Sequence, residues 1–459
     1  MHIHILGIAG TFMGGIAALA RAAGHRVTGS DRGVYPPMST QLASLGIEVI
    51  EGYGPEQLDL KPDVFVVGNV MSRGNPLVEA LLDSGMPYVS GPEWLARNLL
   101  QGQWVLAVAG THGKTTTTSL LASILDHAGL EPGFLVGGVP TGFGVSARAG
   151  AGRCFVVEAD EYDTAFFDKR AKFVHYRPRT AILNNLEHDH DDIYPDVESI
   201  QRQFHLLLRT VPGNGRLVVN AADVNLARVL EMGSWTPVER FGSGRPGSSD
   251  WRVHGTGADG WASFEVVRGE RSLGRVQWNM LGLHNAENAL AALVAAEHAG
   301  VPPSVAIDAL NRFAGVKRRL EVRGVVAGIT VYDDFAHHPT AIATTLDGVR
   351  RRAGAGRVIA VLEPRSNTMK LGTHAAALPA SLAAADRVYV YRSAEVKWDV
   401  ASALQSLGAK AQSHDELAAL TEALCAEARA GDHLVLMSNG SFGGLHDRLL
   451  AALRTRHRA

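Results

Sequence analysis

Apolar and polar positions along the chain repeat in blocks of strand, turn and helix. In one block, residues 104–109 read WVLAVA, an apolar run of strand length, and the later segment TTSLLASILDHAG repeats its apolar positions at helical spacing. Residues 110–118, which connect the two, read GTHGKTTTT. The block predicts a strand, a glycine turn and a helix, which is the context that a phosphate cradle at a helix N-terminus requires.

The side chains of this turn are of the types that bind a nucleoside triphosphate. Glycines let the backbone turn tightly, so that its N–H groups and the helix N-terminus face negative charge. Lys114 is expected to reach the outer phosphates, and the Thr115 hydroxyl to join the accompanying metal. The turn is a shortened form, because Val108 stands where a further glycine is usual, and a plain helix N-terminus is the alternative explanation. The flanking strand and helix favour nucleotide binding, with candidate residues Gly110, Thr111, His112, Gly113, Lys114, Thr115 and Thr116.

A βαβ unit at the N-terminus predicts a second ligand site. The strand at residues 2–6 runs into a glycine-rich turn and a helix, and a second strand ends at Asp31. In a dinucleotide-binding fold such a turn and acid hold a pyrophosphate and a ribose. The glycine spacing is GxxGxxxG rather than GxGxxG, which favours a diphosphate other than a nicotinamide cofactor, with close packing alone as the alternative. A third strand, at residues 64–70, is followed by a polar loop that could reach the same ligand, although an ordinary loop before a helix explains its residues equally well. The candidate residues of this second site are Gly7, Gly10, Thr11, Gly14, Asp31, Ser72 and Arg73.

Acidic residues follow two of the central strands. Glu158, Asp160 and Glu161 come after the apolar run CFVV, and LEHDHDD follows the strand TAILNN. Ligands bind at the carboxyl ends of the strands in open α/β sheets, and magnesium prefers oxygen ligands. We therefore expect Glu158 to bind Mg²⁺ beside Thr115; a solvated acidic turn is the alternative, which the preceding apolar run disfavours. Zinc at residues 188–190 is disfavoured, because adjacent side chains make poor tetrahedral geometry.

The length and the block pattern predict an α/β protein of three domains, because one domain comprises about 100 to 200 residues. We place the domains at residues 1–100, 101–314 and 315–459, with mainly parallel sheets. After residue 212, the segments RLVVN, FEVVRG and RVQWNM are expected to form short antiparallel additions to the central domain. The third domain repeats the scheme of an apolar strand followed by a polar turn, where functional residues often lie.

The composition narrows the class of protein. Of the 459 residues 46% are apolar and 20% are charged, and the formal net charge of -2 leaves no basic field for nucleic acid. The two cysteines, Cys154 and Cys425, exclude a disulfide framework and fit a reducing compartment. The N-terminus lacks the signal-peptide pattern, and no apolar run approaches the about 20 residues needed to cross a bilayer. We therefore expect a cytoplasmic protein without membrane insertion.

Six motifs occur in order along the chain: GTHGKTTT, EADEYD, NNLEHDHDD, GLHNAENALAA, VKRRLE and DDFAHHPTA. In that order and spacing they resemble the Mur ligase family, the ATP-dependent amide-forming enzymes of peptidoglycan assembly. The resemblance covers the whole chain. It implies an N-terminal Rossmann-like domain that binds a UDP-sugar, a central P-loop domain that binds ATP with Mg²⁺, and a C-terminal Rossmann-like domain that binds a peptide.

Further segments resemble particular branches of the family. The glycine turn, with GSD at residues 29–31, resembles that of members that hold UDP-N-acetylmuramate. The segments VYPPMS, AFFDKRAKFVHYRPRT, EPRSNTMK and MSNGSFGG resemble members that join this sugar to the murein tripeptide L-alanyl-γ-D-glutamyl-meso-diaminopimelate in peptidoglycan recycling. The implied reaction passes through an acyl phosphate, and we expect a monomer or weak homo-oligomer. Addition of L-alanine is the alternative within the family; a nicotinamide-dependent oxidoreductase and an ATPase that only switches conformation are more remote.

The resemblance also implies roles for single residues. The implied catalytic residues are Lys114, Glu158, His190 and Arg319. His190 would also bind a second metal and contact the UDP-sugar. Further ATP contacts are implied at His284, Asn285, Asn288 and Arg319 and at Asp333 or Asp334, although Asn285 is equally a candidate helix cap.

Two further features concern the peptide and the second metal. Arg365, Ser366 and Asn367 follow a strand and offer donors suited to peptide carboxylates, although a plain helix N-terminal loop explains them nearly as well. No lysine lies between Lys172 and Lys317. The modified lysine of other family branches is therefore absent, which favours the muramate-binding branch and leaves the full ligand set of the second metal open.

Overall fold

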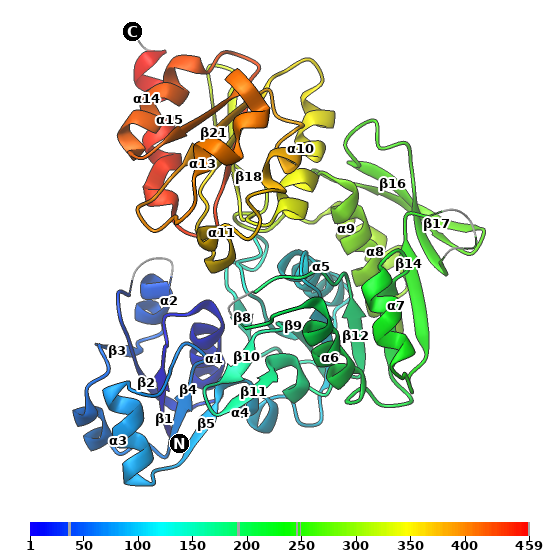
Figure 1. Cartoon of the computed structure of the whole chain (residues 1–459). Helices are drawn as coiled ribbons and strands as arrows, with labels where there is room; N and C mark the ends of the chain where they lie inside the picture. The colour runs from blue at the N-terminus through cyan, green and yellow to red at the C-terminus, as the bar shows by residue number, and fades with distance from the viewer. Residues whose placement is uncertain (35–37, 191–192, 245–246, 248, 458–459) are drawn as a thin grey trace. The chain divides into compact units, whose positions relative to one another are not determined.

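The computed structural model describes residues 1–34, 38–190, 193–244, 247 and 249–457 (Figure 1). Parts of two segments considered above lie outside the described residues, namely 35–37 of VYPPMS and 191–192 of LEHDHDD. The chain divides into two compact units. The first unit comprises residues 1–188, 196–252 and 288–313, and the second unit comprises 189–195, 253–287 and 314–459.

The first unit begins with a five-stranded parallel sheet of order β3-β2-β1-β4-β5. Its strands are β1 (His2–Leu6), β2 (Arg26–Asp31), β3 (Glu48–Glu51), β4 (Val64–Val67) and β5 (Tyr88–Ser90). The helical segments are α1 (Thr11–Ala22), α2 (Met38–Ser44), the 3-10 helix η1 (Pro55–Leu60), α3 (Pro76–Ser84) and α4 (Gly91–Asn98). The strand β1 is buried on both faces from Ile3 onward, because crossover helices cover a parallel sheet on both sides.

A larger sheet in the first unit carries the central part of the chain, in the order β15-β14-β13-β12-β6-β9-β7-β8. The strands are β6 (Trp104–Ala109), β7 (Gly133–Leu135), β8 (Ala147–Arg148), β9 (Cys154–Ala159), β12 (Thr180–Leu183), β13 (Arg216–Asn220), β14 (Val238–Gly242) and the first two residues of β15 (Trp251–His254). The helices are α5 (Lys114–His127), α6 (Val197–Leu208), α7 (Val224–Glu231), α8 (Leu283–His298) from residue 288 onward, and α9 (Pro303–Asn311).

The register of the three central strands brings their carboxyl ends to one edge of this sheet. Val108 of β6 lies opposite Glu158 of β9 and Ile182 of β12, and both pairings are parallel. The segments that follow β6, β9 and β12 therefore start side by side, which is where open α/β sheets bind ligands.

A short antiparallel hairpin joins the two sheets of the first unit. It consists of β10 (Asp163–Ala165) and β11 (Asp168–Ala171) and is followed by the 3-10 turn η2 (Lys172–His175). Phe166 at its tip packs against the apolar cluster of the N-terminal sheet, and the ring of Phe167 meets that of Tyr88 at a centroid distance of 5.1 Å. The hairpin thus fixes the segment after β9 against the N-terminal sheet.

The second unit contains a six-stranded sheet of order β18-β19-β23-β20-β21-β22, in which only the β18–β19 pair is antiparallel. Its strands are β18 (Glu321–Val326), β19 (Ile329–Asp334), β20 (Val358–Leu362), β21 (Arg387–Tyr391), β22 (Ala411–His414) and β23 (His433–Met437). Its helical segments are α10 (Pro339–Ala353), α11 (Asn367–Leu371), α12 (Leu378–Ser381), α13 (Val400–Ala403), η3 (Gln405–Lys410), α14 (Leu417–Glu427), η4 (Phe442–Gly444) and α15 (Leu445–Arg456).

Apolar side chains cover both faces of this six-stranded sheet. Successive residues of β20 point to opposite faces, so Val358 and Ala360 belong to one cluster while Ile359 and Val361 belong to another. An antiparallel hairpin, β16 (Ser263–Arg268) and β17 (Arg271–Gln277), which follows β15 in the strand order of the large sheet, is also assigned to the second unit.

The predicted α/β class with mainly parallel sheets is confirmed, but one strand prediction is wrong. The segment RLVVN is β13, which pairs in parallel with β12 and β14 rather than adding an antiparallel strand. The helices α6 and α7 supply the crossovers that parallel neighbours need. FEVVRG and RVQWNM do form an antiparallel pair. Within the described ranges, no helix is both long enough and apolar enough to span a membrane.

The second unit offers a test of its internal packing. Asp432 is 3% exposed, and it accepts hydrogen bonds from Arg357 Nε at 2.9 Å and from Nη2 at 2.6 Å. We expect Asp432→Ala to lower the free energy of unfolding by about 1.5 to 3 kcal/mol, because it removes two charge-assisted hydrogen bonds and leaves the arginine paired with the more exposed Glu427. Hydrogen exchange of the β20 and β23 amides measures the loss. The control Asp347→Ala, which removes an exposed partner of Arg351, should change this free energy by less than about 0.5 kcal/mol. Equal effects of the two changes would contradict a stabilising role of the buried pair.

Candidate active site

The turn between β6 and α5 is braced by residues that follow β12. The N–H of Thr111 donates to the carbonyl oxygen of Asn185 at 3.1 Å, and the N–H of His112 donates to the Asn185 side-chain oxygen at 2.7 Å. These two N–H groups are therefore engaged inside the protein. The donors that face outward are those of the first turn of α5, because the first N–H groups of any α-helix have no intrahelical acceptor.

Two glycines are required for this turn. Gly110 has φ of 150°, and a Cβ there would lie 2.9 Å from the Cβ of Asn184. Gly113 caps α5 in the left-handed region with φ of 79°, and a Cβ there would lie 2.6 Å from Oδ1 of Asn288. The chain after β12 and the start of α8 thus approach the turn so closely that only glycine fits.

Lys114 is held at the edge of the sheet. Its ammonium donates to the carbonyl oxygens of Gly110 at 2.7 Å and Thr111 at 3.3 Å, and to the carboxylate of Glu161 at 2.8 Å. The side chain of Lys114 is 12% exposed and that of Glu161 is 2% exposed. Burial alone would lower the pKa of Lys114, but the charges of Glu161 and Asp160 outweigh burial and raise that pKa. The lysine is therefore a fixed positive charge beside the turn.

Thr115 and Glu158 present oxygen atoms to each other. The Thr115 hydroxyl donates to Glu158 Oε1 at 3.0 Å, and the backbone N–H of Gly137 donates to Oε2 at 2.7 Å. One hydroxyl in the first turn of α5 and one carboxylate near the end of β9 fit the hard oxygen ligands that Mg²⁺ takes in nucleotide sites. The donor set therefore suits magnesium.

Two asparagines that the sequence reasoning did not single out lie under the turn. The side-chain amide of Asn184 donates to Thr117 Oγ1 at 3.0 Å and to Asn288 Oδ1 at 2.8 Å. Asn184 is 2% exposed and Asn288 is 6% exposed. The predicted residue Asn288 is therefore brought to the cradle, and Asn184 and Asn185 brace it. Their place directly after the strand TAIL is the feature of the sequence that could have identified them.

The N-terminal glycine turn is held by Asp31. The carboxylate of Asp31 accepts the N–H of Ala9 at 2.7 Å and the hydroxyl of Tyr53 at 3.1 Å. Burial and the charge of Asp31 raise the pKa of Tyr53, so this hydroxyl stays protonated and remains a donor. Gly7 has φ of 79°, while Gly10 and Thr11 form the N-cap and first residue of α1.

Other predicted residues near the glycine turn have partners of their own. A Cβ at Gly14 would lie 2.1 Å from Cε of Met38, so this glycine serves close packing. Ser72 and Arg73 are exposed in the loop after β4. Arg73 forms a forked ion pair with Glu79, at 3.0 Å from Nε and 2.9 Å from Nη2, and its side chain is 69% exposed. Such an exposed pair is weak enough to exchange for a ligand.

His190 belongs to the second unit, where it lies beside a buried acid. His190 has φ of 63°, and its N–H donates to the carboxylate of Asp189 at 2.8 Å. Although burial opposes ionisation, the imidazoles of His190 and His337 lower the pKa of Asp189 to about 2. Asp189 is thus ionised at neutral pH. The sequence predicted its neighbour His190, and not Asp189, as a functional residue.

The two adjacent aspartates of the second unit are held by internal partners. Asp333 pairs with three side chains, Arg323, His446 and Arg318, at 3.2, 3.3 and 3.5 Å. Asp334 accepts the N–H groups of Leu320 at 2.7 Å and Ala336 at 2.9 Å. The guanidinium of Arg319 lies 4.8 Å from the centre of the Phe335 ring. A ribose contact by either acid stays a prediction.

The remaining predicted residues of the second unit lie at helix starts. Asn285 donates its side-chain amide to the carbonyl oxygen of Leu281 at 2.6 Å, and His284 precedes it in the first turn of α8. Ser366 caps α11 by accepting the N–H of Met369 at 3.2 Å, which is the plain helix-start explanation. Asn367, the first residue of α11, is exposed.

Arg365 lies against a glycine of the loop after β23. A Cβ at Gly440 would lie 2.3 Å from Cδ of Arg365, so the glycine makes room for the arginine side chain. Arg365 is exposed, and β20 and β23 are parallel neighbours whose carboxyl ends meet. The structure therefore places an available guanidinium at the edge of the sheet where ligands of α/β proteins bind.

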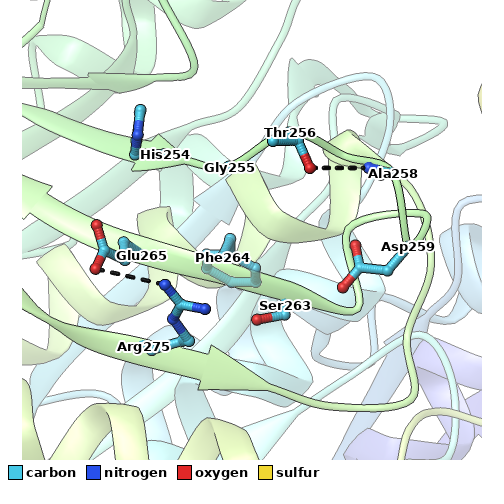
Figure 2. A pocket seen from close by; sticks show the side chains of 9 residues that line it. All are labelled: His254, Gly255, Thr256, Ala258, Asp259, Ser263, Phe264, Glu265 and Arg275. Carbon is cyan, nitrogen blue, oxygen red and sulfur yellow. Dashed lines mark hydrogen bonds and ion pairs between the residues drawn. The ribbon is translucent and has the colours of Figure 1, made fainter.

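A cavity of about 460 Å³ lies on the hairpin of the second unit (Figure 2). It is lined by His254, Gly255, Thr256, Ala258, Asp259, Ser263, Phe264, Glu265 and Arg275. Figure 2 shows Glu265 and Arg275 facing each other from β16 and β17, at 3.7 Å. None of the predicted site residues lines this cavity.

Models of three protein-family domains match the chain. The catalytic-domain model of the Mur ligase family matches residues 2–102, the Mur ligase middle domain matches 108–296, and the Mur ligase glutamate ligase domain matches 318–440. The matched segments together cover most of the chain.

Individual relatives are similar over nearly the full length. The chain is 51% identical to UDP-N-acetylmuramate–L-alanyl-gamma-D-glutamyl-meso-2,6-diaminoheptandioate ligase of Escherichia coli strain K12, over 99% of this chain and 98% of that protein. It is 47% identical to a crystallised murein peptide ligase of Psychrobacter arcticus 273-4, with a TM-score of 0.76 and 99% of both chains covered. UDP-N-acetylmuramate–L-alanine ligase of Myxococcus xanthus is 36% identical over 80% of this chain and 75% of that protein.

Because Asn184 packs so closely against the turn, adding one methyl group at Gly110 should weaken ATP binding. In Gly110→Ala the new Cβ meets Asn184 and strains the backbone, so we expect affinity for ATP to fall about tenfold or more. Isothermal calorimetry with ATP and magnesium measures this. The matched control is Gly102→Ala, which has φ of 77° and no atom within 4 Å of its Cβ, and which should bind ATP as the unchanged protein does. A folded Gly110→Ala protein with unchanged ATP affinity would refute the assignment.

Proposed function

The chain belongs to the Mur ligase family, and we propose that it joins UDP-N-acetylmuramate to the tripeptide L-alanyl-γ-D-glutamyl-meso-diaminopimelate with consumption of ATP. The observation that carries this is the identity of 51% to the Escherichia coli ligase of that name, since 2,6-diaminoheptanedioate is diaminopimelate. The Myxococcus xanthus relative named for L-alanine is 36% identical, and this lower identity ranks L-alanine second as the amine substrate.

A carboxylate needs activation before an amine can attack it. In the proposed reaction the muramoyl carboxylate attacks the γ-phosphorus of ATP, and the bond from that phosphorus to the β–γ bridging oxygen breaks to release ADP. The peptide amine then attacks the acyl phosphate, loses a proton and expels inorganic phosphate. Catalysis of both steps depends on positioning and on neutralising charge on the transferred group.

Lys114 is the residue of the first unit best placed to neutralise that charge. Its ammonium stands beside the turn and at present pairs with Glu161. We propose that a bound phosphate takes the place of part of this pairing, while the first N–H groups of α5 bind the same phosphates. The turn itself moves little, because Asn185 holds Thr111 and His112.

Thr115 and Glu158 are the proposed magnesium ligands, since their oxygen atoms lie 3.0 Å apart. When bound, Mg²⁺ would supply positive charge to the phosphates and fix their orientation. His190, with the ionised Asp189 next to it, is proposed for a second metal. We propose that ATP is also contacted by Arg319, His284 and Asn285. The reaction is proposed to take place in the cytoplasm.

Two other classes of function are less well supported. A nicotinamide-dependent oxidoreductase would use the N-terminal glycine turn but leaves Lys114, Thr115 and Glu158 unexplained. An ATPase that switches conformation would hydrolyse ATP without forming an amide. Neither has a counterpart in the family matches, which cover ligase domains from residue 2 to residue 440.

The product of the reaction distinguishes these functions. With ATP, magnesium, UDP-N-acetylmuramate and tripeptide, we expect a product mass equal to the two substrates minus one water, together with ADP and phosphate. Chelation of magnesium should stop its formation, and Lys114→Met should slow it by about 100-fold or more. A product formed from L-alanine but not from tripeptide would reject the peptide assignment, and hydrolysis without product would reject ligation.

Peptide recognition is tested at Arg365. The guanidinium is exposed beside Gly440 and is suited to a forked pair with a peptide carboxylate. In Arg365→Ala we expect the KM for tripeptide to rise about 10- to 100-fold while the KM for ATP stays the same. Steady-state kinetics at saturating UDP-N-acetylmuramate measure both constants. Arg392→Ala removes an exposed arginine paired with Asp415 and is the control; an unchanged KM for tripeptide in Arg365→Ala would exclude this role.

A further inference from the structure

A second buried ammonium lies beside the cradle and has no part in the proposed mechanism. Lys172, the first residue of the turn η2, has a side chain that is only 7% exposed. Its Nζ donates to Asp160 Oδ2 at 3.1 Å. The same Nζ lies 5.3 Å from the centres of the Phe12 and Tyr162 rings. The ammonium is thus enclosed by one carboxylate and two aromatic rings.

The surroundings of Lys172 leave hydrogen-bonding capacity unused. An ammonium has three donors, and burying one is costly unless its donors are satisfied. Among the residues that the structure describes, Asp160 is the hydrogen-bond acceptor of Lys172 Nζ. The two rings attract the positive charge through their faces but replace a hydrogen bond only in part. The ammonium of Lys172 can therefore donate a further hydrogen bond to another anion.

The position of this ammonium relates it to both predicted ligand sites of the first unit. Asp160 is shared, because its other oxygen lies 3.9 Å from the ammonium of the cradle residue Lys114. Phe12 is the second residue of α1, directly after the glycine turn that is proposed to bind the UDP-sugar. Lys172 consequently lies between the place of the triphosphate and the place of the sugar nucleotide.

A second polar group of the same turn is buried near these acids. Tyr176, which caps η2, is 2% exposed, and its hydroxyl has no hydrogen-bond partner within the described part of the chain. Burial raises the pKa of Tyr176, and the charges of Asp160 and Glu158 add to this effect. Its hydroxyl is therefore a protonated donor close to the acids at the end of β9.

We propose that Lys172 binds the lactyl carboxylate of UDP-N-acetylmuramate and holds it toward the phosphate on Lys114, an inference that rests on the proposed function. The sharing of Asp160 by the two lysines favours the carboxylate over the diphosphate, because the carboxylate is the group that must approach the γ-phosphate to within about 3 to 3.5 Å. Lys172 thereby selects muramate over sugars that lack the lactyl group.

Comparing two sugar nucleotides shows whether Lys172 binds the carboxylate or the diphosphate. UDP-N-acetylmuramate and UDP-N-acetylglucosamine share the uridine, the diphosphate and the acetylated sugar, and only the first carries the carboxylate. The experiment is calorimetric titration of the full-length protein with each compound, without tripeptide. The unchanged protein is expected to bind the muramate about 10- to 100-fold more tightly, as a charge-assisted hydrogen bond provides.

In Lys172→Met the preference for the muramate should fall to within about threefold while affinity for UDP-N-acetylglucosamine is kept. Lys172→Gln retains a donor for Asp160 without the charge, so it answers the same question if the methionine variant does not fold. The control is Lys169→Met on strand β11, which removes a lysine that is 70% exposed and pairs with Asp163. It should keep the full preference.

The outcomes distinguish this inference from the proposed function. If the unchanged protein binds both nucleotides equally, muramate is not its substrate and the proposed function fails. If the unchanged protein prefers the muramate and a folded Lys172 variant retains that preference, the role of Lys172 is overturned. An equal loss for both nucleotides assigns Lys172 to the diphosphate or to packing and likewise overturns it.

Discussion

The parallel pairing of β9, β6 and β12 is the constraint on which the candidate site depends. Parallel strands end at the same edge, so the residues that follow all three are neighbours although they are far apart in the sequence. The opposition of Val108 and Glu158 brings a carboxylate to the turn that begins α5, and Ile182 opposite the same valine brings the two asparagines after β12 under it. Because this register is set by largely apolar, buried strands, a shift would expose the core.

The candidate site also depends on acids that compensate the charges of its buried lysines. Two ammonium groups are buried at this edge, and each would be costly without an acid. Lys114 has Glu161, Lys172 has Asp160, and Asp160 also faces Lys114. A protein with this arrangement keeps its cations in place before any ligand arrives, so that binding a phosphate exchanges one anion for another instead of charging an empty site. Such preorganisation is what makes electrostatic stabilisation of a transferred group effective.

Much of the fold and part of the site follow from the sequence. The alternation of apolar strands with helices gave the α/β class, and the residues GTHGKTTT identified the turn, because a strand and a helix flank it. The parallel pairing of RLVVN was not predictable from its apolar run of three residues, since so short a run occurs in parallel and in antiparallel strands. Nor did the sequence reveal that Asn185 engages the N–H of His112, that Glu79 holds Arg73, or that Ser366 caps a helix. These depend on pairings over many residues, or on local hydrogen bonds that compete with ligand binding.

The segment AFFDKRAKFVHYRPRT connects fold and specificity. It begins in the hairpin whose Phe166 packs against the N-terminal sheet, and it continues into the turn that starts at Lys172. The backbone N–H of Lys172 donates to the carbonyl oxygen of Tyr162 at 3.0 Å, so its place relative to the acids after β9 is fixed by the closing end of the hairpin. The contact that joins the two sheets of the first unit thus also positions the buried ammonium. A change in the hairpin would therefore alter stability and substrate selection together, whereas a change at Lys172 alone would alter selection while leaving Phe166 in its packing.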